Sequence, residues 1–73
     1  MNEWERLRRK AAYMKECYPV GSRVKLVFMD DAQAPPVGTL GTVSCVDAIG
    51  TIHVRWDTGS TLGVTAVDKC VRI

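Results

Sequence analysis

The side chain best suited to proton transfer in this 73-residue sequence is its single histidine, His53. Acid–base or nucleophilic catalysis would require a nucleophile or a carboxylate held beside the imidazole. No motif places Ser44 or a cysteine there, and His53 falls in a stretch of alternating apolar and polar residues. We interpret it as an exposed histidine on a strand, and we predict no catalytic residues.

Four aspartates could hold a divalent cation if they met at one end of the fold. They are Asp30, Asp31, Asp47 and Asp57. Their spacing lacks the D-x-D-x-D-G pattern of a calcium loop, and aspartate is a common turn residue. We therefore predict turns at these positions, with no metal site and no cofactor.

The three cysteines are Cys17, Cys45 and Cys70. Their odd number, their long spacings and the lack of a C-x-x-C pair argue against a disulfide scaffold and a zinc knuckle. We interpret them as reduced thiols of a cytoplasmic protein. Cys45 and Cys70 are predicted to be small buried hydrophobic residues in strands.

The net charge of +2 is carried entirely by the leading segment. Residues 1–16 hold five basic and three acidic residues, whereas residues 17–73 hold five of each. A balanced domain is not the electrostatic footprint of a typical DNA-binding protein. The basic residues that could contact nucleic acid are Arg6, Arg8, Arg9, Lys10, Arg23, Lys25 and Arg55.

The leading segment, residues 1–17, is predicted to be an amphipathic helix. Asn2 can cap it with Glu5 three residues on, and Pro19 ends it because proline disfavours helical geometry at the preceding residue. One face carries an apolar stripe at 3-4-3 spacing, made by Trp4, Leu7, Ala11 and Met14. A lone helix of this length is marginal in water. We therefore expect the stripe to pack on the rest of its own chain, on a second copy or on a partner.

After Pro19 the pattern alternates with period 2, which predicts strands. We expect strands over residues 23–28, 41–46, 51–56, 60–64 and 69–73, with a long irregular loop over 30–38. The side chains predicted to point inward are Val24, Leu26 and Phe28 on the first strand, and Ile52, Val54 and Trp56 on the third.

Five short strands in about 55 residues cannot bury their apolar faces as one flat sheet. The predicted fold is mainly β: a small five-stranded SH3-like barrel, residues 18–73, preceded by one N-terminal α-helix. The runner-up is an OB-fold, which is usually longer and carries a helix where this chain has only Asp57-Thr58-Gly59.

A chain this short buries only about 60% of its unfolded surface, so it has little scaffold for a catalytic cleft, and we predict no enzyme. Polyproline grooves and methyl-lysine cages both need clustered aromatic side chains. Phe28 and Trp56 are expected in the core, so we expect neither binding mode. The N-terminus is charged from the start, and no apolar run matches a secretory signal or a membrane span.

Several short motifs carry a family resemblance. They are Y-P-x-G-x-R-V at 18–24, M-D-D at 29–31, P-x-G-x-x-G-T-V at 36–43, V-D at 46–47 and G-x-I-H-V-x-W-D-x-G at 50–59. As a set, these motifs resemble domain-of-unknown-function family 4314. The resemblance implies a small protein of Gram-positive bacteria or of phage and other mobile elements, with no assigned activity. The G-T-V and W-D-x-G elements more loosely resemble KOW-type and Mib/Herc2-type barrels.

The function that we expect is protein–protein interaction, and the resemblance implies a role as an accessory factor of a mobile element. Tryptophan is enriched in binding hot spots. The candidate contact residues are Trp4, Leu7 and Met14 on the helix and Asp30 and Asp31 at the long loop. The alternative is a KOW-like nucleic-acid-binding module that uses the basic residues. An enzyme is the third hypothesis, and the sequence leaves monomer and homodimer open.

Overall fold

The computed structural model describes residues 2–65 and 67–73, and these form one helix followed by five strands. The elements are α1 (Glu3–Cys17), β1 (Arg23–Phe28), β2 (Leu40–Val46), β3 (Ile52–Trp56), β4 (Gly63–Val64) and β5 (Lys69–Arg72). The predicted helix and the five predicted strands are all present, in the predicted order. The fourth strand is much shorter than expected.

The helix begins and ends where its capping residues predict. The Asn2 side-chain oxygen accepts a hydrogen bond of 2.8 Å from the backbone N–H of Glu5, which satisfies one free donor of the first turn. At the other end, the N–H of Tyr18 donates to the carbonyl of Met14 at 2.8 Å, directly before Pro19. Local sequence alone therefore sets the length of α1.

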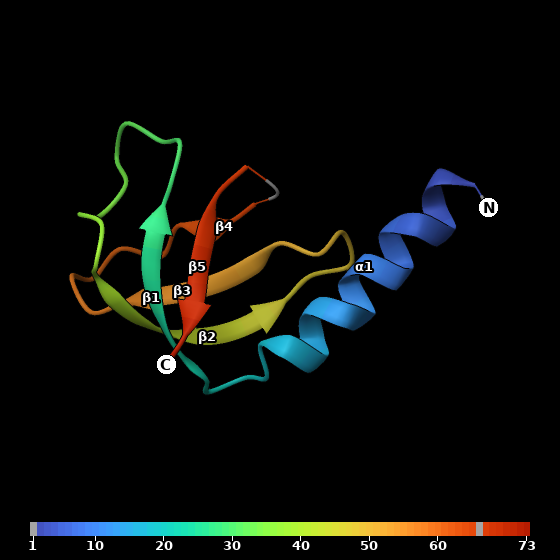
Figure 1. Cartoon of the computed structure of the whole chain (residues 1–73), viewed down its shortest axis with the longest axis horizontal. Helices are drawn as coiled ribbons and strands as arrows, with labels where there is room; N and C mark the ends of the chain where they lie inside the picture. The colour runs from blue at the N-terminus through green and yellow to red at the C-terminus, as the bar shows by residue number, and fades with distance from the viewer. Residues whose placement is uncertain (1, 66) are drawn as a thin grey trace.

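The strands form one antiparallel sheet in the order β4-β3-β2-β1-β5 (Figure 1). Among residues 2–65 and 67–73, β4 and β5 are not paired with each other, so the sheet is open and a closed barrel is not confirmed. The indole N–H of Trp56 donates to the Leu62 carbonyl at 3.0 Å, directly before β4.

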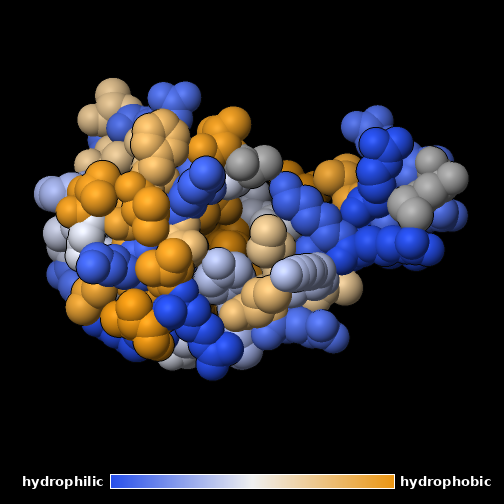
Figure 2. All heavy atoms as spheres, in the orientation of Figure 1, coloured by the Kyte–Doolittle hydropathy of each residue, from blue (hydrophilic) through white to orange (hydrophobic). Residues whose placement is uncertain are grey.

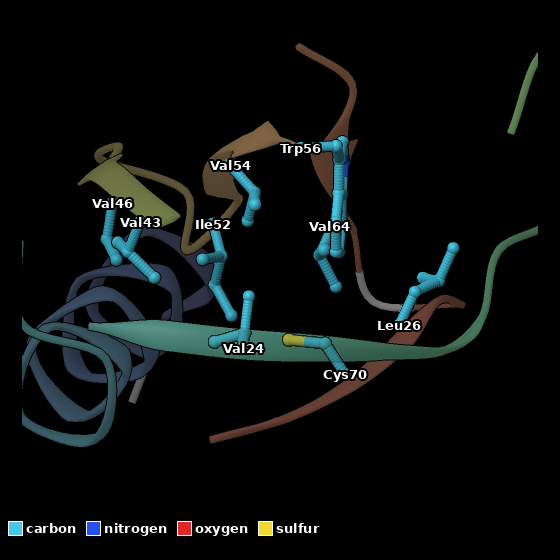
Figure 3. Packing of buried hydrophobic residues seen from close by; sticks show 9 residues of the cluster. All are labelled: Val24, Leu26, Val43, Val46, Ile52, Val54, Trp56, Val64 and Cys70. Carbon is cyan, nitrogen blue, oxygen red and sulfur yellow. The ribbon is translucent and has the colours of Figure 1, made fainter. Parts of the chain in front are cut away.

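The sheet bends around a single apolar core, shown in Figure 3. The alternation of side chains on β3 is as predicted, since Ile52, Val54 and Trp56 are all buried. The buried cluster contains Val24, Leu26, Val43, Val46, Ile52, Val54, Trp56, Val64 and Cys70. Every strand of the sheet contributes a residue to this cluster, which explains how so short a chain can bury one continuous core.

Two residues predicted to be buried are exposed, and each lies at an irregularity in the ladder. The β1–β5 register shifts between Leu26 and Phe28, and Phe28 is 49% exposed. The β2–β3 register shifts between Val43 and Cys45, and Cys45 is exposed. A bulge changes the face to which the following side chain points. The prediction for Cys70 is confirmed, because this thiol is buried in the core.

The helix packs on the sheet with only its second half. Ala11 is buried, and Met14 and Tyr18 pack against the core cluster. The first turns extend away from the sheet (Figure 1), which gives the molecule dimensions of 38 × 25 × 16 Å. The chain's own sheet, one of the three expected packing partners, therefore covers the Met14 end of the apolar stripe and leaves the Trp4 end uncovered. No helix in the described part of the chain is long and apolar enough to cross a bilayer.

Candidate functional site

The part of α1 that extends beyond the sheet, residues 3–9, is called the helix tip below. Its most prominent side chain is Trp4, which is 58% exposed although tryptophan usually buries most of its surface. Leu7 follows on the same face and is half-buried. Figure 2 shows the tip as a mainly hydrophilic projection, because charged side chains surround this short apolar face. An exposed tryptophan on a rigid helix can anchor a protein contact.

The structure does not bring the other predicted contact residues to the helix tip. Met14 packs against the core, so it belongs to the covered end of the stripe. Asp30 and Asp31 are exposed at the start of the loop after β1, which Figure 1 places across the sheet from the tip. The Asp31 carboxylate accepts the N–H of Gln33 at 2.8 Å, as expected for a turn residue.

Two of the seven basic candidates have other partners. Arg23 binds Asp57 through two hydrogen bonds of 2.9 and 2.6 Å, and it also donates to the Thr42 hydroxyl at 2.9 Å. This contact raises the pKa of Arg23 and lowers the pKa of Asp57, so the two charges neutralise each other. The methylene groups of Lys10 lie against Gly50, where an added Cβ would meet them at 3.2–3.4 Å.

The five remaining basic candidates are exposed in two separate places. Arg6, Arg8 and Arg9 surround the helix tip, while Lys25 and Arg55 lie on β1 and β3. The structure therefore supports no single basic surface that unites all seven residues, and the largest local group is on the tip.

His53 has a partner that the sequence reading missed. Its Nε2 lies 2.9 Å from Oδ2 of Asp47, and both side chains are partly exposed. The other oxygen of Asp47 accepts the backbone N–H groups of Ile49 and Thr51 at 3.0 Å each. Asp47 thus fastens the turn between β2 and β3 to the strand that follows. This pair could have been predicted from the sequence, since Asp47 and His53 flank one tight turn.

This histidine–aspartate pair is not accompanied by a nucleophile in the described part of the chain. The Ser44 hydroxyl donates to the backbone carbonyl of His53 at 3.1 Å, not to its ring. No group of three histidine, cysteine or acidic residues within 2–65 and 67–73 could hold a metal ion. The geometry of the pair fits a structural clamp on the β2–β3 turn.

A hollow of about 360 Å³ lies between α1 and the two end strands of the sheet. It is called the α1–β5 groove below. Its apolar lining comes from Met14, Tyr18, Val27, Ile52, Val64, Cys70 and Val71, and its polar lining from Lys10, Thr65, Asp68 and Lys69. The groove lies where the sheet would have to continue in order to close.

A scan against protein families matches residues 7–73 to the family described as Domain of unknown function (DUF4314). The chain belongs to this family. Searches of curated proteins and of solved structures found no match. The DUF4314 match extends beyond the motifs that carried the resemblance, because it starts inside α1 and includes all residues of the α1–β5 groove. Trp4 and Arg6 precede it.

In this DUF4314 protein the Asp47 clamp makes a pH-dependent contribution to stability. The hydrogen bond with His53, followed by those from Thr51 and Ile49, lowers the pKa of the Asp47 carboxyl below its usual value of 3.8. A lowered folded-state pKa stabilises the fold above the unfolded pKa, and this contribution is lost as the pH falls through the folded pKa.

We therefore expect Asp47→Ala to lower the urea midpoint at pH 7, and the difference from the parent chain to shrink as the pH falls from 4 to 2. Urea unfolding followed by circular dichroism at several pH values measures this. Asp31→Ala is the matched control, because Asp31 holds a turn without a histidine partner. An Asp47→Ala deficit that stays constant down to pH 2 would contradict the role of the charged carboxylate.

Proposed function

We propose that this DUF4314 chain is a small protein-binding module, and that the helix tip is its contact surface. The observation that carries the proposal is the 58% exposure of Trp4 on a helix that extends beyond its own domain. Tryptophan contributes more binding energy at interfaces than most residue types, because it buries a large rigid surface.

The apolar stripe supports the proposal because it continues past the sheet. Ala11 and Met14 fill the end that packs on the core, and Trp4 and Leu7 continue the same face outward. A partner that covers the helix tip would continue the packing that Ala11 and Met14 make against the sheet. The arginines around Trp4 favour an acidic rim on that partner.

The strand order also supports a finer description of the fold. A long loop after β1, tight connections between β2, β3 and β4, and a last strand beside β1 follow the layout of SH3-like barrels. We propose that residues 18–73 form such a barrel and that residues 1–17 are its added binding element. The family resemblance implies an accessory role for a phage or conjugative element, and the free cysteines favour the cytoplasm.

The test compares two exposed aromatic residues of one helix. Trp4 and Tyr13 are 58% and 57% exposed, and the nine-residue spacing places them on opposite faces of α1. Tagged protein is used to capture partners from its native host, and captured proteins are quantified by mass spectrometry. We expect Trp4→Ala to reduce partner capture by at least about thirtyfold, the effect of a hot spot of 2 kcal/mol. Tyr13→Ala should change it little.

Both variants should keep the thermal midpoint of the parent chain, because neither side chain is in the core. If Trp4→Ala leaves capture unchanged, the helix tip is not the contact surface and the proposal is wrong.

Nucleic-acid binding remains the second candidate, and the specific observation in its favour is the exposed group Arg6, Arg8 and Arg9. Such binding would weaken steeply with salt because phosphate contacts release counterions. Capture is therefore repeated after nuclease treatment, and the purified chain is titrated with mixed DNA and RNA at low salt. Partners that disappear with nuclease, together with salt-sensitive binding, would favour this candidate over protein binding.

A further inference from the structure

The α1–β5 groove has an apolar floor whose deepest residues are buried and whose margins are exposed. Met14, Ile52 and Val64 line it together with the buried thiol of Cys70. Val27 and Val71, which also line it, remain 42% and 47% exposed. A hollow of about 360 Å³ is within the usual size range of binding sites. It can accept one or two apolar side chains of a ligand.

The groove is bordered by a free strand edge. The N–H of Ile73 donates to the carbonyl of Arg23, so alternate residues of β5 face β1. By the same alternation, Cys70 and Arg72 direct their backbone groups away from β1. The Tyr18 hydroxyl reaches this side of β5, because it donates to the Cys70 carbonyl at 3.3 Å. The outward groups of β5 left to a ligand are therefore the N–H of Cys70 and both backbone groups of Arg72. Within residues 2–65 and 67–73, no strand pairs with this edge.

The charged groups at the groove are unbalanced in favour of positive charge. Lys10 and Lys69 line it, and Lys10 rests its methylene groups on Gly50 while its ammonium group remains near water. The one carboxylate, Asp68, already accepts hydrogen bonds of 2.9–3.0 Å from Asp30 and Thr65. A ligand therefore meets two ammonium groups and a carboxylate whose oxygens are occupied.

We propose that the α1–β5 groove binds an extended, acidic segment of a partner protein, which adds as a strand to the free edge of β5. Main-chain hydrogen bonds to the Cys70 N–H and to both backbone groups of Arg72 would supply affinity, as in other sheet-edge complexes. Alternate side chains of the segment would enter the apolar floor, and its carboxylates would pair with Lys10 and Lys69. This site is separate from the helix tip, and the proposal does not depend on Trp4.

The charges on β5 argue against a second copy of this chain as the occupant. Antiparallel pairing of two β5 strands about Val71, the register in which the outward-facing Cys70 and Arg72 pair, would place the two Arg72 side chains at diagonal positions on one face. Long side chains at diagonal positions across two strands reach each other, so these like charges would repel. Basic residues on an edge strand are a common protection against self-association, so the edge favours an acidic partner.

The test is a titration of the ¹⁵N-labelled full chain, followed by amide chemical shifts. The probe is an eight-residue peptide in which glutamate alternates with leucine. The controls are the same peptide with lysine in place of glutamate, and the glutamate peptide with alternate backbone nitrogens methylated so that it cannot pair as a strand. We expect shifts concentrated at Cys70 and Arg72 with the first peptide. Both controls should bind at least about tenfold more weakly.

The matched variants reverse one charge each. We expect Lys69→Glu and Lys10→Glu each to weaken binding of the glutamate peptide by about tenfold. Arg55→Glu, an equal charge change on β3 outside the groove, should leave it unchanged, and so should Trp4→Ala. Lys69 is exposed, so this variant tests the site even if Lys10→Glu disturbs the packing of the helix.

Three results would overturn the proposal. The first is the absence of shifts at β5 at millimolar peptide. The second is equal binding of the lysine or methylated peptide. The third is a set of β5 shifts that depends on protein concentration without any peptide, which would identify a second copy as the occupant.

Discussion

Replacing Trp56 by alanine should leave most of the chain unfolded at room temperature. Trp56 is 1% exposed and is the largest fully buried side chain. Its loss removes apolar packing at the centre of the core, and such truncations cost about 3–5 kcal/mol. It also frees the Leu62 carbonyl that the indole N–H binds at 3.0 Å. A single small core leaves a total margin of only about 3–5 kcal/mol.

Thermal and urea unfolding followed by circular dichroism measure this effect. The control is Trp4→Ala, which removes the same side chain from a position that is 58% exposed. Its unfolding free energy should stay within about 0.5 kcal/mol of the parent chain. A cooperative transition of Trp56→Ala near the parent midpoint would show that the core does not depend on this indole.

The second large effect is expected at Gly41, where β2 crosses the core. A Cβ added there would lie 2.5 Å from Cγ1 of Val54, 2.8 Å from Cε3 of Trp56 and 3.1 Å from the carbonyl oxygen of Arg55. None of these atoms can move away freely, because they belong to the buried part of β3 and to its backbone. Gly41→Ala should therefore cost about 1–3 kcal/mol, the usual range for an overpacked core.

Gly38→Ala separates this crowding from backbone effects. Gly38 has a φ of +93° but nothing within 4 Å of an added Cβ, so its cost is that of backbone conformation alone. A double-mutant cycle with Val54→Ala tests the crowding itself, because Gly41→Ala should cost less once Val54 is truncated. Full additivity of the two substitutions would mean that the Cβ does not meet Val54.

The features of the fold that local rules control were predictable from the sequence. The Asn2 cap and Pro19 gave the helix, and the alternation in 51–56 placed Ile52, Val54 and Trp56 inward, as observed. The bulges near Phe28 and Cys45 were not predictable, because period-2 reasoning assumes a regular ladder. An inserted residue leaves no mark in the pattern of apolar and polar residues.

The candidate site was less predictable than the fold because it depends on contacts between distant segments. The stripe from Trp4 to Met14 is uniform in the sequence, and only packing decides that Met14 is covered while Trp4 is not. The α1–β5 groove forms only where α1, β4 and β5 meet, and no local sequence pattern predicts that these elements meet. The Asp47–His53 pair was within reach of local reasoning, since one turn joins the two residues.

The position of β5 beside β1 has a consequence for biosynthesis. Residues 69–72 must pair with residues 24–28, so the ladder between them joins segments more than forty positions apart. A ribosome releases β1 long before β5, and until then one edge of β1 has no strand to bind. Non-local pairing of this kind slows folding. The nascent chain therefore exposes an unpaired apolar strand until residues 69–72 leave the exit tunnel, and the docking of Tyr18 on Cys70 can follow only then.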